Sequence, residues 1–207
     1  MRNIYIIGAQ STGKTTLVDA LESRLGIRAA ATHEVRARKP PVIREVARTV
    51  LKEKGFNRED ITTSRARALQ LQQHILEAQY TAELETSTSD ASSWYICDRS
   101  GLDPIVYAKC FVGTEAAAAM LGSRSWLQLE SRMKAGIVIL CEAGCRWLVD
   151  DGIRLMPGDA EEWLRIDDAF RDLLNMRGID FSIVPKDLAD IEERVDLVER
   201  LLDASCK

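Results

Sequence analysis

One stretch near the start of the chain constrains its fold more than any other. An apolar run from Ile4 to Ile7 is followed by Gly8, Gly13, Lys14 and Thr15, in the pattern Gly-x-x-x-x-Gly-Lys-Thr. A short apolar run bounded by glycine predicts a buried parallel strand. The spacing behind it is that of a phosphate-binding loop, or P-loop, that leads into a helix. We expect this helix to run from Lys14 to about Arg24, with the apolar side chains of one face packed on the sheet.

The residue types of this loop suit a nucleotide and a metal ion. Gly8 and Gly13 allow positive φ and a close approach of the backbone, so that successive N–H groups can point at phosphate oxygens. Lys14 would reach the β- and γ-phosphates, and the Thr15 hydroxyl would ligate Mg²⁺. The predicted cofactors are therefore ATP and Mg²⁺. The predicted nucleotide-binding residues are Gly8, Ala9, Gln10, Ser11, Thr12, Gly13, Lys14, Thr15 and Thr16.

Composition restricts the remaining classes. A chain of 207 residues with 46% hydrophobic residues can form one α/β domain, which we expect to span residues 1–207. A net charge of −4 without a basic stripe argues against a nucleic-acid partner. No stretch is long and apolar enough to span a bilayer and no signal peptide is evident, so we expect a cytoplasmic protein.

A second segment with chemistry follows a loop that we place at Gly26 to Pro40. We expect a strand from Pro41 to Val46, and parallel strands present their carboxyl ends to the ligand crevice. Glu45 and Arg48 lie at or just beyond this end. The alternative for Glu45 is an ordinary surface ion pair with Arg48, three residues further on.

The next candidate is an aspartate at the end of another short strand. Trp94 to Cys97 is apolar and is followed by Asp98-Arg99-Ser100. A carboxylate beside the P-loop strand is where nucleotide-bound Mg²⁺ needs an acidic partner. Either Asp98 or Glu45 could orient or deprotonate an acceptor hydroxyl, and the sequence does not separate the two.

The remaining periodic segments alternate between strand and helix. A long helix, capped by Thr62 or Thr63, should run to about Glu85, and it could pair across the axis of a homodimer. Further helices are predicted from Leu102, at Glu115–Leu121, Ser125–Lys134, Glu161–Met176 and Leu188–Leu202, and further strands at Ile137–Leu140 and Asp180–Val184. This alternation favours a doubly wound, mainly parallel sheet.

The charged segment from Cys141 to Arg154 lies behind the predicted strand at Ile137–Leu140. Its charges and Gly152 suit a mobile lid, at about residues 143–160, that could bring Arg146 or Arg154 onto phosphate oxygens during transfer. The alternative is a solvated loop with local ion pairs.

Together these residues resemble the P-loop kinase superfamily of nucleoside and nucleotide kinases, and more narrowly the NadR-like (ribosylnicotinamide kinase-like) AAA domains. The resemblance rests on the P-loop, Glu45-Val-Ala-Arg48, the strand that ends at Asp98, and the Trp-x-x-Asp-Asp-Gly-x-Arg pattern of Trp147 to Arg154. It implies a three-layer αβα P-loop NTPase with a five-stranded parallel sheet of nucleoside monophosphate kinase type, in the order 2-3-1-4-5. At the end of the strand that precedes Asp98, the resemblance to NadR-like kinases implies Asp-Thr-Asp. This chain has Asp98-Arg99-Ser100 instead, which is closer to the Asp-Arg-Ser of deoxynucleoside and thymidylate kinases.

The leading hypothesis is a kinase that moves the γ-phosphoryl group of ATP to a nucleoside-like acceptor. Its predicted catalytic residues are Lys14, Asp98, Glu45 and Arg154, and its predicted metal ligands are Thr15 and Asp98. The predicted acceptor-binding residues are Glu45, Arg48, Asp98, Arg99 and Tyr107. The alternative is a regulatory switch in which GTP or ATP orders a surface for a partner, although the Asn/Thr-Lys-x-Asp segment of a GTPase is missing.

Overall fold

The computed structural model describes residues 2–31, 39–57, 59–89, 94–146 and 159–205. At its centre lies a parallel sheet of five strands in the order β2-β3-β1-β4-β5, which confirms the predicted order. The strands are β1 (Ile4–Ile7), β2 (Val42–Ile43), β3 (Ile96–Asp98), β4 (Ile137–Cys141) and β5 (Phe181–Val184).

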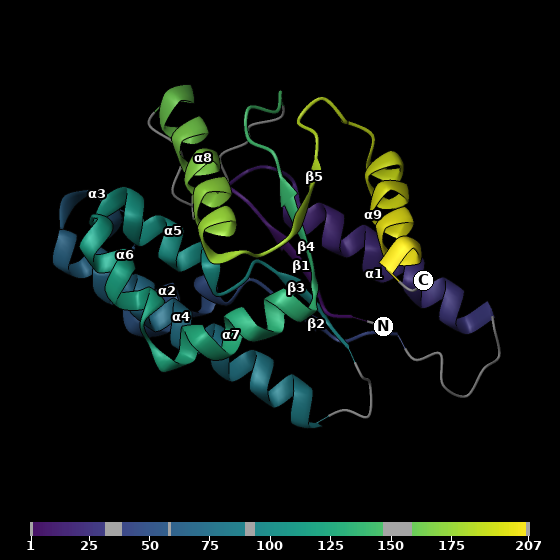
Figure 1. Cartoon of the computed structure of the whole chain (residues 1–207), viewed down its shortest axis with the longest axis horizontal. Coiled ribbons are helices and arrows are strands. Elements are labelled where there is room, and N and C mark those ends of the chain that lie inside the picture. Colours follow the sequence, from purple (N-terminus) through teal and green to yellow (C-terminus); the bar gives the residue numbers. More distant parts are fainter. Residues whose placement is uncertain (1, 32–38, 58, 90–93, 147–158, 206–207) are drawn as a thin grey trace.

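Helices cover both faces of the sheet, as Figure 1 shows. One face carries α1 (Lys14–Ala31) and α9 (Ile191–Ser205), and the other carries α4 (Arg65–Ser89), α5 (Leu102–Phe111), α7 (Arg124–Ala135) and α8 (Ala160–Arg177). The shorter helices α2 (Val46–Lys54), α3 (Glu59–Thr63) and α6 (Thr114–Leu121) pack outside this second layer. Within the described ranges, no helix combines the length and the apolar composition needed to cross a membrane.

The apolar run of β1 explains why the sheet is covered on both sides. Tyr5 and Ile7 point into the core beneath α4, α5, α7 and α8, whereas Ile4 and Ile6 point into the core beneath α1 and α9. All four side chains are fully buried. Successive side chains of a strand alternate between faces, so an unbroken apolar run is expected only where both faces are packed.

Two predicted boundaries near the N-terminus are wrong. Helix α1 does not end near Arg24 but continues through Gly26 to Ala31, so the predicted loop from Gly26 begins too early. Alanines favour the helix, and they compensate for a glycine whose cost in a helix is only about 1 kcal/mol. Strand β2 is confined to Val42–Ile43, because α2 begins at Val46 and Glu45 is its N-cap residue.

The predicted long helix is interrupted at its start. Thr62 and Thr63 end the short α3, and each hydroxyl donates a hydrogen bond back to the Glu59 carbonyl. Helix α4 begins after Ser64, whose Oγ accepts a hydrogen bond from the Arg67 N–H at 3.4 Å. Ser64, not a threonine, therefore occupies the N-cap position.

A buried polar cluster lies between the sheet and helices α4 and α7, and we call it the Glu83 cluster. The Glu83 carboxylate accepts hydrogen bonds from the Tyr95 hydroxyl at 2.8 Å, the Tyr5 hydroxyl at 3.2 Å and the Gln79 amide at 2.9 Å. The other members are Cys97, whose thiol lies 3.9 Å from Glu83, and Arg132, whose guanidinium lies 3.8 Å from it. Burial raises the pKa of the Glu83 carboxyl above its usual range, although its donors oppose the shift.

Candidate nucleotide and acceptor site

The loop between β1 and α1 has the backbone shape expected of a P-loop. Gly8 has φ of 133° and Gly13 has φ of 80°, and Ser11 adopts φ of 57°. A Cβ atom at Gly8 would lie 2.5 Å from the Cys141 carbonyl oxygen, so only glycine fits there. The positive φ values turn the chain back on itself, which is the geometry that gathers N–H groups around an anion.

Lys14 is the first residue of α1, and its side chain folds back onto this loop. Its ammonium donates hydrogen bonds to the Ala9 carbonyl and, at 3.3 Å, to the Thr12 hydroxyl, and the residue is only 4% exposed. Burial, together with repulsion by Arg99, lowers the pKa of Lys14 to about 8. A bound phosphate would supply the negative charge that this buried cation needs.

Thr15 and Asp98 come together as the sequence predicts. Strand β3 pairs with β1 so that Asp98 lies beside Ile6, two residues before the P-loop begins at Gly8. The Thr15 hydroxyl donates to Asp98 Oδ2 at 2.7 Å. Asp98 is 1% exposed, and its Oδ1 has no hydrogen-bond partner among the described residues. A hydroxyl and a buried carboxylate with an unused oxygen fit Mg²⁺, which prefers oxygen ligands.

A chain of ion pairs follows β3. Arg99 has φ of 84°, and its Nε donates to Glu45 at 2.7 Å while Nη1 lies 3.3 Å from Asp103. Burial opposes the charge of Arg99, yet the nearby carboxylates hold its pKa well above the usual value. The Glu45 carboxylate also accepts a hydrogen bond from Arg48 at 2.9 Å. The Glu45–Arg48 pair thus exists, but it is not an ordinary surface pair, because the Glu45 side chain is only 8% exposed.

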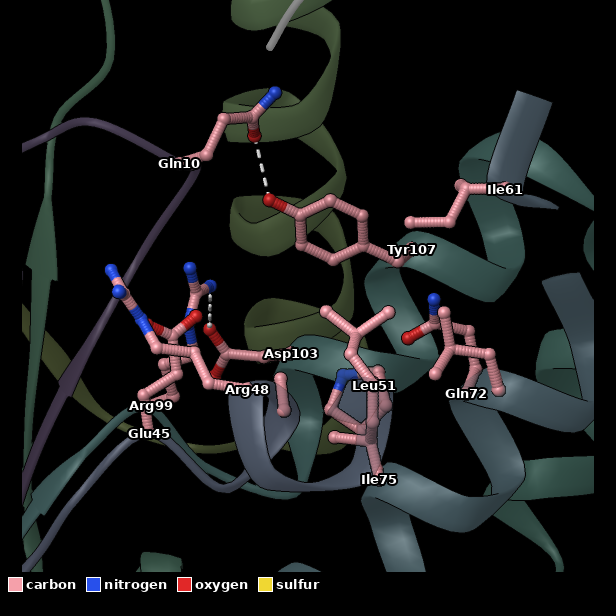
Figure 2. A pocket seen from close by; sticks show the side chains of 13 residues that line it. Gln10, Glu45, Arg48, Leu51, Ile61, Gln72, Ile75, Arg99, Asp103 and Tyr107 are labelled. Atoms are coloured by element: carbon pink, nitrogen blue, oxygen red, sulfur yellow. Dashed lines mark hydrogen bonds and ion pairs between the residues drawn. The ribbon is translucent and has the colours of Figure 1, made fainter. Parts of the chain in front are cut away.

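A pocket opens beside these ion pairs, and it contains about 580 Å³ of empty space, part of it open to solvent. Figure 2 shows its charged end, formed by Glu45, Arg48, Arg99 and Asp103, and the apolar wall beyond it. Residues of that wall include Leu51, Ile61, Leu71, Ile75 and Pro104. The Tyr107 hydroxyl donates to the Gln10 side-chain oxygen at 2.6 Å, so the pocket adjoins the P-loop directly.

Besides the apolar wall, the structure adds two polar pocket residues that were not predicted. Asp103 accepts hydrogen bonds from the N–H of Ser100 at 2.8 Å and its hydroxyl at 3.0 Å, and the Ser-x-x-Asp spacing of a capping box could have revealed it. Gln72 is 4% exposed and lines the pocket from α4, and nothing in the sequence distinguishes it from other polar residues of that helix.

Most of the predicted site residues lie together. The structure brings the P-loop, Lys14 and Thr15 to Asp98, and it places the predicted acceptor residues Glu45, Arg48, Arg99 and Tyr107 around the pocket. Asp98 does not line that pocket. Thr16 is exposed in the first turn of α1, and Arg146 is exposed. Arg154 and most of the predicted lid lie outside the described residues.

Comparisons with known proteins give a family and a fold. A family model described as an AAA domain matches residues 3–194. The deoxyadenosine kinase from M. mycoides, solved with bound dATP, matches 98% of this chain and 100% of its own, with a TM-score of 0.62 and 14% identity. The NadR protein, solved in complex with NR, matches with a TM-score of 0.65 and 15% identity over 96% of this chain. This chain covers 50% of the NadR chain, about half its length. No curated protein matches the sequence significantly. The fold is that of P-loop kinases.

Proposed function

Because the chain belongs to the AAA-domain family whose model matches residues 3–194, we propose that it is an ATP- and Mg²⁺-dependent kinase. It transfers the γ-phosphoryl group to a hydroxyl of a nucleoside-like small molecule. The observation that carries this proposal is the pocket beside the P-loop, where the buried carboxylate of Glu45 adjoins an apolar wall. A protein that only binds a nucleotide has no need of a second pocket at this place.

The charges of the pocket favour a neutral acceptor. The pocket holds two arginines and two carboxylates. Arg48 pairs with Glu45, and Arg99 pairs with both Glu45 and Asp103. A phosphate group on the acceptor would bring negative charge to a place where the positive charges are already neutralised. The apolar wall suits a ring system. Together with the paired charges, it favours a nucleoside over a nucleoside monophosphate.

The contacts of the two carboxylates suggest separate roles. Asp98 is bonded to Thr15 and would hold Mg²⁺, directly or through water, and the ion would neutralise charge on the β- and γ-phosphates. Glu45 lines the pocket and is held from both sides by Arg48 and Arg99, so we assign to it the orientation of the acceptor hydroxyl.

In the transfer step, the acceptor oxygen forms a bond to the γ-phosphorus. The bond between that phosphorus and the β,γ-bridging oxygen breaks, and ADP leaves with the electron pair. The hydroxyl proton passes to Glu45. Lys14 and the loop N–H groups hold the phosphates, and Arg154, the candidate cation of the lid, stabilises the transferred charge.

Product analysis tests this proposal. The protein is incubated with ATP, Mg²⁺ and a panel of nucleosides, nicotinamide riboside and nucleoside monophosphates, and phosphorylated acceptors are detected by mass spectrometry. We expect a phosphorylated nucleoside with the wild-type protein and none with Lys14→Ala. A product from a monophosphate, with none from any nucleoside, would contradict the neutral-acceptor assignment.

A further inference from the structure

The carbonyl groups of the P-loop are bonded to side chains one after another. The Ala9 carbonyl accepts a hydrogen bond from Thr12 Oγ1, within the loop, at 3.0 Å. The next three carbonyls are reached by side chains from other parts of the chain. Trp163 Nε1 donates to the backbone carbonyl oxygen of Gln10 at 2.9 Å, and Arg194 Nη2 donates to that of Thr12 at 3.0 Å. The Cys145 thiol lies 3.7 Å from the backbone carbonyl oxygen of Ser11.

These three donors form a buried collar around the loop. Trp163 is 4% exposed, Cys145 is 5% exposed and Arg194 is 3% exposed. Trp163 lies near the start of α8, Cys145 follows β4, and Arg194 lies near the start of α9. Burying an indole N–H or a guanidinium is costly without an acceptor, so these contacts fix the side chains and the loop together.

The peptide geometry connects this collar to phosphate binding. In a trans peptide the carbonyl of one residue and the N–H of the next point in opposite directions. A donor on the Gln10 carbonyl therefore lies behind the N–H of Ser11, and a donor on the Thr12 carbonyl lies behind the N–H of Gly13. Hydrogen bonds in a chain polarise one another, so each outer donor strengthens the N–H that the loop offers to an anion. Arg194 also places a buried positive charge next to the loop.

We propose that Trp163 and Arg194 are positioning residues that hold the P-loop in its anion-binding shape and raise its affinity for the nucleotide phosphates. This inference rests on the proposed function, because it needs a nucleotide at the loop. Neither residue touches the phosphates. Their contribution is to fix the loop beforehand, so that binding does not have to order it.

The test compares two variants with two matched controls. Trp163→Phe keeps the ring and removes the N–H, and Arg194→Met keeps the stem and removes the charge. Trp126→Phe makes the same change at a fully buried tryptophan whose Nε1 has no acceptor among the described residues. Arg24→Met removes an arginine that pairs with Glu192, Asp196 and Glu199 of α9 without contacting the loop.

Calorimetry measures the Kd of ATP and ADP with Mg²⁺, initial rates give KM and kcat, and melting temperatures check that each variant folds. We expect the Kd and KM of ATP to rise about fivefold for Trp163→Phe and about thirtyfold for Arg194→Met, following typical neutral and charged hydrogen bonds. The KM of the acceptor and the Kd values of both controls should stay within about twofold of wild type, a smaller change than one hydrogen bond gives. If Arg194→Met does not fold, the comparison of Trp163→Phe with Trp126→Phe decides.

Three results would overturn the inference. Unchanged ATP affinity in Trp163→Phe would refute it while leaving the kinase proposal intact. An equal loss in the control variants would assign the effect to general packing. A wild-type protein that binds no nucleotide would overturn the inference and the proposed function together.

Discussion

Replacement of Asp98 by asparagine isolates the charge at the predicted metal position. Asparagine has the same shape and keeps an oxygen that can accept from the Thr15 hydroxyl, which now donates to Asp98 at 2.7 Å. The negative charge is lost, and with it the oxygen that has no partner among the described residues. An electrostatic contact that acts in the transition state typically contributes about 2.7–4 kcal/mol. Turnover should therefore fall by roughly 10²–10³-fold.

The fold should tolerate this change. One oxygen of Asp98 is already buried without a partner among the described residues, so an amide there should alter the free energy of unfolding by about 1 kcal/mol or less. The assay measures initial rates of ADP release over a range of Mg²⁺ concentrations, with melting temperatures alongside. Asp19→Asn, at a carboxylate of α1 that is 57% exposed, is the matched control. A wild-type rate in Asp98→Asn at every Mg²⁺ concentration would refute the assignment.

Three further predictions concern the loop, the pocket and the Glu83 cluster. Gly8→Ala should lower the free energy of unfolding by more than about 1 kcal/mol, because φ is 133° and a Cβ would meet the Cys141 carbonyl at 2.5 Å. Urea denaturation measures this change. An unchanged midpoint would contradict the positive φ of Gly8 and its close approach to Cys141. Gln72→Leu should raise the KM of the acceptor about tenfold and leave the KM of ATP unchanged, since Gln72 is a polar group in the pocket wall. If wild type and Gln72→Leu had the same KM for the acceptor, Gln72 would not contribute to acceptor binding. Glu83→Gln should gain thermal stability relative to wild type as pH rises. The folded pKa of the Glu83 carboxyl is raised, so this group stabilises the wild-type protein fully below its unfolded pKa of 4.5. The wild-type protein loses that contribution as the pH rises through the folded pKa, whereas the glutamine variant has none to lose. Melting curves from about pH 5 to pH 8 measure this difference, and parallel curves would show that Glu83 does not titrate there.

The parts of the site that could be predicted are those encoded by short local patterns. The P-loop depends on a strand, two glycines and a helix within fifteen residues, so its chemistry can be deduced without the rest of the fold. Asp98 was found because a polar residue at the carboxyl end of a strand faces the crevice of a parallel sheet. The strand order was predicted from the family resemblance, and the sheet confirms that order.

The parts that could not be predicted depend on how distant elements pack. Gln72 enters the pocket only because α4 lies against α2 and α5, and Trp163 and Arg194 reach the P-loop only because α8 and α9 begin beside it. Periodicity shows that a helix has a buried face, but it does not say which partner each buried polar group meets. The ends of α1 and α4 were misplaced for a similar reason, since weak local signals such as Gly26 and Thr62 gave way to the surrounding helix and to a better cap.

Acceptor-dependent ADP release tests the central claim most directly. The protein is given ATP or GTP with Mg²⁺, with and without each neutral nucleoside, and Lys14→Ala serves as the blank. The proposed kinase predicts a large stimulation of ADP release by at least one neutral nucleoside and none in the blank. Tight nucleotide binding with slow hydrolysis that no acceptor stimulates would contradict a kinase, and would instead indicate a nucleotide-dependent switch.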